Sequence, residues 1–344
     1  MKKMHVAMYY DNNDVRIEEM PIPEINDNEL LVKVQASGIC GSDVMEWYRI
    51  KNAPLVLGHE ITGDVVQVGK NVEKYKVGER VFVSHHVPCN SCRYCLNDQH
   101  TLCDTLHSTN FHPGGFAEYL RVSEINVDRG VFLLPKEMSY EEGVFIEPLA
   151  CVIRGTRIVG MKLGASVLVI GSGIAGLLHI KLARALGAGR VIATDIDDYR
   201  LETAKKLGAD MAINARENVT EKLKKYNDGR LADIVVLCTG AMPAVKQAIN
   251  SVDRGGTLLF FAPTEPGLEI PFPLFDLWNK GVKIVSTYAG SPRDIAEAIE
   301  LIRFKKVTVT DMISHKLPLK EAAKGFKLTA QAQESIKIVI CPHK

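Results

Sequence analysis

The sequence is poor in the features on which nucleic-acid binding depends. Only 7% of its 344 residues are aromatic, and the formal net charge is +1, with no basic stripe in which aromatic residues are interleaved. Because nucleic-acid-binding surfaces rely on such stripes, we expect no DNA or RNA partner. The sequence also lacks low-complexity segments and repeats of solenoid length, so neither a disordered chain nor a repeat array is expected.

A long uninterrupted apolar run is missing as well. The longest apolar stretch, residues 167–186, contains His179, Lys181, Arg184 and three glycines, so we do not expect it to span a membrane. The two lysines near the start are followed by neither an apolar run nor a small-residue cleavage site, so we expect no export signal. These absences predict a cytoplasmic protein without a membrane partner, whose ligand is a small molecule.

Cysteine, by contrast, is concentrated in one place. Four of the eight cysteines form a CxxCxxCx7C pattern within fifteen residues, at Cys89, Cys92, Cys95 and Cys103. In a reducing compartment such a pattern favours metal binding over disulfides. Four thiolates suit tetrahedral zinc, and short CxxC turns bring two sulfurs to one ion. The pattern therefore predicts a zinc site. Because four thiolates fill a tetrahedron, we interpret the flanking histidines as ordinary loop or surface residues, namely His85, His86, His107 and His112.

The length of the chain predicts two domains, and the apolar pattern differs between its halves. Short alternating segments separated by glycine and proline, typical of a β-rich, barrel-like domain, occupy residues 31–36, 61–68 and 80–83. After about Gly155 the alternation gives way to continuous apolar runs, each followed by turn or helical sequence, at residues 167–170, 191–194, 234–237 and 258–261. These runs predict an α/β domain whose parallel sheet has helices on both faces.

Two later segments also give local signals. Ser291 and Pro292 predict the start of a helix, because serine caps the first turn and proline supplies its fixed φ. Residues 335–340 alternate again, and we expect them to rejoin the β-rich domain.

A glycine loop of the GxGxxG type lies between the first buried strand and the following helix. Gly171 allows the tight turn, Gly173 lets the backbone approach a pyrophosphate, and Gly176 lets the helix pack closely. Ile174, within the same loop, is also counted among the cofactor-binding residues, and the N-terminus of the helix that follows faces the negative charge of the phosphates. A glycine turn of another α/β protein is the competing interpretation, and the position between strand and helix argues against it.

The residues that follow the next strand bear on the choice of dinucleotide. Asp195 ends that strand, nineteen residues beyond Gly176, where a carboxylate accepts hydrogen bonds from ribose hydroxyls and repels a 2′-phosphate. NAD is therefore favoured over NADP. Arg200 is expected along the adenosine ribose, with a solvated helix arginine as the alternative.

Further candidate metal ligands are dispersed along the chain. Cys40 lies in GICGSD, His59 and Glu60 in GHE, and Glu147 in FIEP. Together with the four-cysteine segment and GSGIAG, these motifs occur in the order found in the zinc-dependent medium-chain dehydrogenases, which the chain resembles over essentially its whole length. The carboxylate of FIEP, in place of a second cysteine, is similar to the sorbitol, threonine and galactitol-phosphate dehydrogenase branch.

The resemblance implies a fold and two zinc ions per chain, one catalytic and one structural. It implies a GroES-like catalytic domain at residues 1–154 with a structural zinc lobe at about 85–110, and a Rossmann NAD-binding domain at 155–290. Residues 291–344 would return to the catalytic domain. The active site is expected in the cleft between the domains, and a homo-oligomer, either a tetramer or a dimer, is expected as in relatives.

The resemblance also implies roles for single residues. Cys40 and His59 would be ligands of the catalytic zinc, with Glu60 or Glu147 completing the set directly or through water. Asp43 would orient His59 through its second ring nitrogen.

Proton transfer is where the sequence departs from the family. Ser42 would take the first step of the proton relay, but Met45 stands where many relatives have the histidine that completes it. The positions that shape the sorbitol pocket align with Glu46 and Thr287, so that pocket is not reproduced.

These expectations lead to one preferred function and several alternatives. The preferred function is a zinc-dependent, NAD-linked dehydrogenase that oxidises a secondary hydroxyl of a polyol, a sugar derivative or a hydroxy-amino acid. A threonine-type dehydrogenase, with Glu46 meeting the substrate ammonium, is the alternative of the same class. A non-catalytic NAD-binding protein with structural zinc only is the alternative of another class. A further alternative is that the cysteine segment is a nucleic-acid-binding ribbon. It is disfavoured because the segment has no basic residue beyond Arg93.

Overall fold

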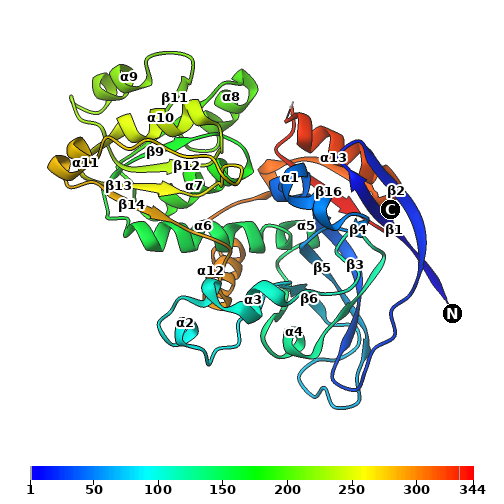
Figure 1. The fold of residues 1–344 in the computed structure, drawn as a ribbon. Coiled ribbons are helices and arrows are strands. Elements are labelled where there is room, and N and C mark those ends of the chain that lie inside the picture. Colours follow the sequence, from blue (N-terminus) through cyan, green and yellow to red (C-terminus); the bar gives the residue numbers. More distant parts are fainter. Residues whose placement is uncertain (1, 333) are drawn as a thin grey trace. The chain divides into compact units, whose positions relative to one another are not determined.

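The structure, a computed structural model, describes residues 2–332 and 334–344 and divides into two compact units (Figure 1). Unit 1 comprises Met1–Ala150 and Gly290–Lys344, and unit 2 comprises Cys151–Ala289. Helix α6 (Ile146–Val159) begins in unit 1 and ends in unit 2. Within the described residues, no helix combines the length and the apolar character that a membrane span needs.

Unit 1 is rich in strands, as the alternating segments predict. Its strands are β1 (Lys3–Asp11), β2 (Asp14–Pro21), β3 (Leu30–Gly38), β4 (Leu55–Val56), β5 (Glu60–Val68), β6 (Arg80–Val83), β7 (Tyr119–Val122), β8 (Val131–Leu133), β15 (Ile313–Pro318) and β16 (Lys337–Cys341). Its α-helices are α1 (Glu46–Arg49), α2 (Arg93–Leu96), α3 (Asp104–Ser108), α4 (Glu124–Arg129), α5 (Tyr140–Gly143), α12 (Pro292–Arg303) and α13 (Ala322–Gln331). Single 3₁₀ turns are η1 (Gly41–Val44), η2 (Ile50–Asn52), η3 (His100–Leu102), η4 (Thr310–Met312) and η5 (Leu319–Glu321).

The central sheet of unit 1 is mostly antiparallel. Its strand order is β15-β16-β3-β5-β6-β8, with β7 also paired to β3. Alternate residues of β3 and β5 point into one core, where Val32, Val34, Ile61 and Val65 are fully buried. The predicted strands at 31–36, 61–68 and 80–83 are confirmed as β3, β5 and β6, because alternation of this kind matches the two faces of a pleated sheet.

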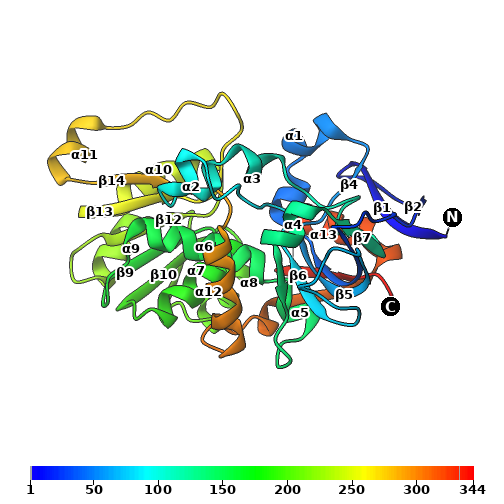
Figure 2. The ribbon, with the colours of Figure 1, turned by 90° about the horizontal axis from the view of Figure 1, so that it is seen from below.

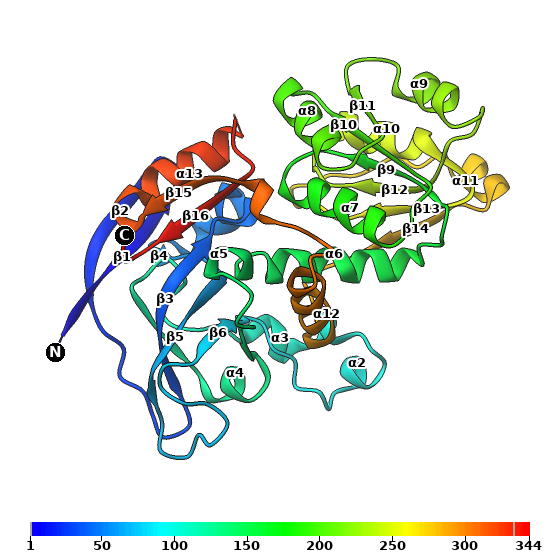
Figure 3. The ribbon, with the colours of Figure 1, turned by 180° about the vertical axis from the view of Figure 1, so that it is seen from behind.

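The last strand of the chain completes this sheet. Figure 3 shows the red β16 between β15 and the blue β3, and β16 pairs with β3 through Val339 opposite Gly38. The expectation that residues 335–340 rejoin the β-rich domain is therefore confirmed. Helix α12 begins as predicted, with Ser291 as the capping residue and Pro292 in the first turn.

A second, smaller sheet of unit 1 was not predicted. Strands β1 and β2 form a hairpin, and β4 pairs with β1. Figure 2 shows the hairpin at one edge of unit 1, close to the C-terminus. Its buried Tyr9 packs against Phe326 of α13, with ring centroids 5.7 Å apart, so this sheet and the C-terminal helix share one apolar core.

Unit 2 is a parallel sheet with alternating strands and helices. Its strands are β9 (Ser166–Ile170), β10 (Arg190–Asp195), β11 (Met211–Asn214), β12 (Ala232–Leu237), β13 (Val252–Phe260) and β14 (Lys283–Ser286). Its helices, besides the second half of α6, are α7 (Ile174–Ala185), α8 (Asp198–Lys206), α9 (Val219–Tyr226), α10 (Met242–Ser251) and α11 (Leu274–Lys280).

The strand order of unit 2, β11-β10-β9-β12-β13-β14, is the order of a doubly wound Rossmann sheet. All five neighbouring pairs are parallel, and every residue of β9 is buried. Burial on both faces explains why this strand reads as one continuous apolar run. The predicted α/β fold, with a β-rich part and a doubly wound parallel sheet, is confirmed.

Candidate functional site

The dispersed metal-ligand candidates of unit 1 meet at one end of the central sheet. Strands β3 and β5 are antiparallel neighbours in which Gly38 pairs with Glu60. The residues just after β3 and at the start of β5 are therefore brought together, although they are far apart in the sequence. The candidate donor atoms of Cys40, His59 and Glu60 all lie within 4.8 Å of one another.

Asp43 holds both Cys40 and His59 in place. Its carboxylate is fully buried, accepts a hydrogen bond from the Cys40 backbone N–H at 3.0 Å, and lies 3.4 Å from Nδ1 of His59. Burial alone would lower the pKa of His59, but Asp43 and Cys40 outweigh it and raise this pKa well above its ordinary value. Burial would likewise raise the pKa of Asp43, but the neighbouring His59 and Arg49 hold it below its ordinary value.

Ser42 lies beside the same donor group. Its hydroxyl is 3.4 Å from the Cys40 sulfur, and its backbone N–H lies 3.5 Å from that sulfur. The side chain that the resemblance assigns to the first step of proton transfer is therefore next to the candidate ligands.

Glu60 has a partner that the sequence analysis missed. Its carboxylate forms an ion pair with Lys337 of β16, and both side chains are almost completely buried, with exposed fractions of 1% and 0%. Lys337 also donates a hydrogen bond to the Ile39 carbonyl oxygen at 3.1 Å. A lysine in an alternating strand is usually expected to face solvent, so the pattern of residues around Lys337 did not predict this pair.

Glu147 lies in the first turn of α6 and is partly exposed. Among the described residues, the group of donors within 4.8 Å contains Glu60 and does not contain Glu147. Which of these two carboxylates completes the ligand set stays a prediction.

Two of the histidines before the cysteine segment are not ordinary loop residues. His85 lies against His59, with ring centroids 4.9 Å apart, and the rings of His85 and His86 are 3.7 Å apart. Burial lowers the pKa of His85 well below its ordinary value and that of His86 to about 3. The interpretation is therefore correct in placing this pair in a loop, since both residues follow β6, but they are not ordinary loop residues, because His85 packs against His59. It is correct for His107 and His112, which are exposed.

The four cysteines form a compact group, as predicted. All four sulfurs lie within 4.8 Å of one another, and the Cys89–Cys95 and Cys92–Cys95 sulfur distances are 4.0 and 3.6 Å. Tetrahedral zinc with bonds of 2.3 Å requires sulfur separations of about 3.8 Å, so the geometry fits this ion.

Backbone hydrogen bonds and burial affect how readily the cysteine thiols ionise. Hydrogen bonds from the N–H groups of Ser91 and Cys92 lower the pKa of Cys89 to about 5. Burial raises the pKa of Cys95 to about 12, so this thiol needs a nearby cation to ionise at neutral pH. A bound divalent ion would supply that charge.

The glycine loop of unit 2 has the geometry that a dinucleotide requires. Gly171 has φ of +92°, a left-handed conformation that favours glycine, and Gly173 precedes the first residue of α7, Ile174. A Cβ atom at Gly176 would clash with the Gly171 carbonyl oxygen. The helix can therefore begin this close to the strand only with glycine at position 176.

Asp195 lies at the end of β10 and is held by the backbone. Its carboxylate accepts hydrogen bonds from the N–H groups of Ser172, Ile196 and Asp197 at 2.7, 2.8 and 3.1 Å. A carboxylate offers about four acceptor positions, so one remains for a ribose hydroxyl.

Arg200 points toward the glycine loop. A Cβ atom at position 173 would lie 3.5 Å from the Arg200 guanidinium. The guanidinium therefore lies close to the Gly173 backbone. A dinucleotide phosphate or ribose fits between a backbone of this kind and a cation.

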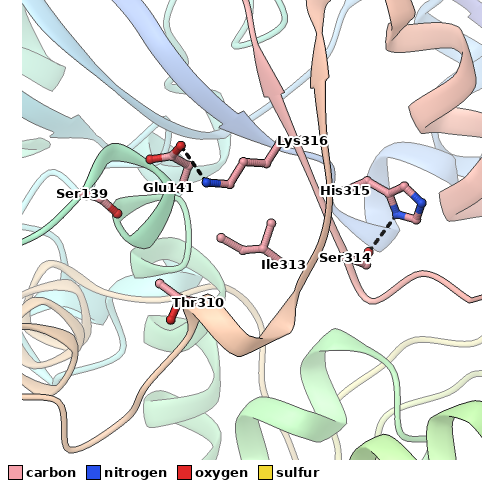
Figure 4. Close-up of a pocket in the computed structure, with 7 residues that line it drawn as sticks. All are labelled: Ser139, Glu141, Thr310, Ile313, Ser314, His315 and Lys316. Carbon is pink, nitrogen blue, oxygen red and sulfur yellow. Dashed lines mark hydrogen bonds and ion pairs between the residues drawn. The ribbon is translucent and has the colours of Figure 1, made fainter.

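A separate hollow lies elsewhere on unit 1 (Figure 4). It is lined by Ser139, Glu141, Thr310 and residues 313–316, and an ion pair of 3.0 Å joins Glu141 to Lys316. None of the sequence-predicted site residues that the structure describes lines this hollow. Its mixed, largely satisfied lining does not suggest a reaction site.

Comparisons with known proteins agree with this geometry. Residues 26–135 match the alcohol dehydrogenase GroES-like domain family, and residues 175–303 match the zinc-binding dehydrogenase family. The chain is 31% identical over 355 residues to a sorbitol dehydrogenase of Bacillus subtilis (strain 168), covering 100% of this chain and 98% of that relative.

Two solved structures are similar along nearly the whole chain. A zinc-binding dehydrogenase of Sinorhizobium meliloti 1021 bound to NADP has a TM-score of 0.90 and 28% identity, covering 99% of this chain and 100% of that one. An alcohol dehydrogenase of Escherichia coli CFT073 complexed with NADH has a TM-score of 0.88 and 26% identity, with the same coverage. These neighbours support a nicotinamide cofactor without distinguishing NAD from NADP. The chain belongs to the zinc-dependent medium-chain dehydrogenases, in the branch of the sorbitol dehydrogenases, and is an enzyme of that family.

Proposed function

We propose that this enzyme interconverts a secondary alcohol of a polyol, sugar alcohol or sugar derivative and the corresponding ketone, with NAD as the cofactor. The observation that carries the proposal is the group formed by one thiol, one imidazole and one carboxylate, Cys40, His59 and Glu60. Three protein ligands leave a position for substrate, whereas a fourth thiolate would close it. The similarity to a sorbitol dehydrogenase supports a polyol as the substrate class.

The residues around this group have separate tasks in the proposed reaction. Zinc, when bound, supplies a Lewis acid that lowers the pKa of a substrate hydroxyl, and NAD supplies the hydride acceptor. Asp43 faces Nδ1 of His59, which leaves Nε2 as the ligand atom. Ser42 presents its hydroxyl next to the Cys40 sulfur, where it can exchange a hydrogen bond with the reacting oxygen.

The ligand and cofactor assignments form part of the proposal. Cys40 and His59 bind the catalytic zinc, and Glu60 or Glu147 completes the set directly or through water. The four-cysteine group binds a second, structural zinc. In unit 2, the glycine loop receives the pyrophosphate and Asp195 the adenosine ribose. The fixed negative charge of Asp195 at the end of β10 supports NAD over NADP, because a 2′-phosphate would be repelled.

A substrate screen combined with metal analysis tests the proposal. We expect NAD-linked oxidation of at least one polyol or sugar alcohol, and two zinc ions per chain. Activity on threonine but on no polyol would replace the proposal with a hydroxy-amino-acid dehydrogenase. One zinc per chain, NAD binding and no turnover on any alcohol would indicate a non-catalytic NAD-binding protein.

We also propose that the enzyme is a homo-oligomer, a dimer or a tetramer, in which unit 2 contacts a second copy. Strand β14 is an edge of the parallel sheet, and an unpaired edge is a common pairing site. Around it, large apolar side chains are exposed, with fractions of 76% for Leu274, 72% for Phe275 and 74% for Trp278. Clustered exposure of this kind is typical of interfaces.

Light scattering coupled to size-exclusion chromatography tests the oligomer. We expect W278E to lower the oligomeric state at micromolar concentration. The matched control is L163E, because Leu163 is also exposed, at 84%, but lies outside this cluster. A monomeric wild-type chain, or equal behaviour of the two variants, would contradict the proposed interface.

The domain limits and the location complete the proposal. We assign residues 1–154 and 291–344 to catalysis and residues 155–290 to NAD binding. A cytoplasmic location is supported by the thiol ligands, which bind metal best where they stay reduced. Fractionation of cells with an antibody to the chain would test it.

A further inference from the structure

We propose that Arg49 is a positioning residue that orients both Ser42 and Asp43, and so prepares the groups that surround Cys40 and His59 for reaction. The inference rests on the proposed function and adds to it a residue outside the predicted ligand and relay sets.

The contacts of Arg49 lead to both candidate ligands. Its Nε donates to the Ser42 carbonyl oxygen at 2.9 Å, and its Nη2 donates to the Ser42 hydroxyl at 3.1 Å. The same Nη2 lies 3.7 Å from the Asp43 carboxylate. Ser42 is in turn 3.4 Å from the Cys40 sulfur, and Asp43 is 3.4 Å from His59. Two short chains of contacts therefore run from one side chain to the two ligands.

The position of Arg49 is well defined by its surroundings. It ends the short helix α1, its side chain is only 20% exposed, and its guanidinium lies 4.7 Å from the centroid of the Tyr48 ring. The preceding turn is fixed from the other side, because Asn12 donates a hydrogen bond to the Val44 carbonyl oxygen at 2.9 Å. The planar fork of arginine suits this double contact, and a lysine ammonium would not reproduce it.

This arrangement decides what the Ser42 hydroxyl can do. Arginine stays protonated in proteins, so Arg49 donates hydrogen bonds and cannot receive a proton. With one lone pair of Ser42 engaged by Arg49, the hydroxyl hydrogen is directed to the side where Cys40 lies. A substrate oxygen that develops negative charge near Cys40 would accept a hydrogen bond from the Ser42 hydroxyl, and the positive charge of Arg49 would strengthen that bond. With methionine at position 45, Arg49 stabilises charge where a histidine would have accepted a proton.

Substitution of Arg49 by methionine and by lysine tests the proposal, with K51M as the matched control because Lys51 is an exposed cation in the adjoining turn η2. We expect R49M to lower kcat by about 10- to 100-fold with KM changed by less than about threefold, since a group aimed at the transition state affects kcat. R49K should restore part of the loss, because it returns the charge without the fork. K51M should match the wild type.

A second readout needs no turnover. Competition with a chelator measures zinc affinity, and R49M should weaken the less tightly held zinc by about tenfold, because groups that orient metal ligands contribute this much. In addition, R49M combined with S42A should lose less kcat than the product of the two single losses, because either substitution removes the contact between Arg49 and the Ser42 hydroxyl, whereas only R49M removes the contact with Asp43.

The outcomes that overturn the proposal are distinct. If R49M keeps kcat and zinc affinity within twofold of the wild type, Arg49 does not position these groups. If R49M only lowers the melting temperature, or if its effect adds fully to that of S42A, its role is structural and the proposal is wrong. If R49M does not fold, the same measurements on R49K decide. If the wild type oxidises no alcohol, the proposed function fails, and the zinc-affinity comparison of R49M with K51M still decides the role of Arg49.

Discussion

Replacement of Lys337 by methionine removes the only ion-pair partner that the structure shows for the Glu60 carboxylate within the described residues. The two side chains are buried to 1% exposure or less, so water cannot replace the missing ammonium without a change in structure. Methionine keeps most of the length and apolar stem of lysine. The substitution therefore tests the charge rather than the packing.

The size of the effect follows from the burial of the pair. Removing one partner of a buried ion pair costs about 3–5 kcal/mol, because the other charge is left uncompensated. For a unit of 150–250 residues, this corresponds to a decrease in melting temperature of about 6–20 °C. The lower end applies when a metal ion near Glu60 offsets part of the lost charge. The double variant E60Q/K337M should recover at least half of the loss, because it leaves no charge buried alone.

Differential scanning calorimetry of zinc-loaded protein provides the measurement, with K316M as a matched control. Lys316 forms an ion pair with Glu141 at 3.0 Å, but the two side chains are 46% and 21% exposed. An exposed pair contributes about 0–1 kcal/mol, so K316M should shift the melting temperature by no more than about 4 °C. Equal shifts for K337M and K316M, or a double variant less stable than K337M alone, would refute the reasoning.

Three further predictions concern the zinc lobe, the cofactor and acid stability. C95S should lower the melting temperature and release one zinc, because the cysteine lobe depends on metal for its fold. C40S should abolish activity with little change in melting temperature. Similar melting temperatures for the two variants would contradict this division. D195A should raise the KM for NAD by about tenfold or more and reduce the preference for NAD over NADP. Initial rates with each cofactor measure both effects. Burial would raise the pKa of Glu142, but its ion pair with Lys305 holds this pKa below the ordinary value. The ion pair therefore stabilises the folded state above about pH 4.3, and this stabilisation is lost as the pH falls through the folded-state pKa. E142Q should therefore be less stable than the wild type at pH 7, by about 1 kcal/mol in the free energy of unfolding, and the difference should shrink as the pH falls below about 4.3. A difference independent of pH would count against the ion pair.

Much of the fold was predictable because local patterns and the fold agree. The strands β3, β5 and β9 bury the faces that their alternating or continuous apolar patterns indicate. The start of α12 follows from its cap, and the cysteine group follows from its spacing, since both depend on neighbouring residues. The hairpin β1–β2 was missed because its strands carry charged residues at the exposed positions and lack a glycine turn.

The parts of the site that escaped prediction depend on contacts between distant residues. Lys337 meets Glu60 only because β16 pairs with β3 and β3 pairs with β5. The alternating pattern predicts that β16 is a strand, but it does not indicate which strand lies next to it. Likewise, the helical turn that brings Arg49 back to Ser42 is too short to show a periodic signal. His85 was misinterpreted because its closeness to His59 follows from the pairing of β5 with β6.

The late position of β16 in the chain has a consequence for biosynthesis. Unit 2 is one continuous segment, but unit 1 is interrupted by it, and Lys337 follows Glu60 by 277 residues. At about 5–20 residues per second, a ribosome needs roughly 15–55 s to deliver the lysine after the glutamate. During this interval the edge of β3 has no β16 to cover it, and the glutamate has no ammonium beside it. The pairing of Glu60 with Lys337, beside Cys40 and His59, can therefore form only after the whole of unit 2 has been synthesised.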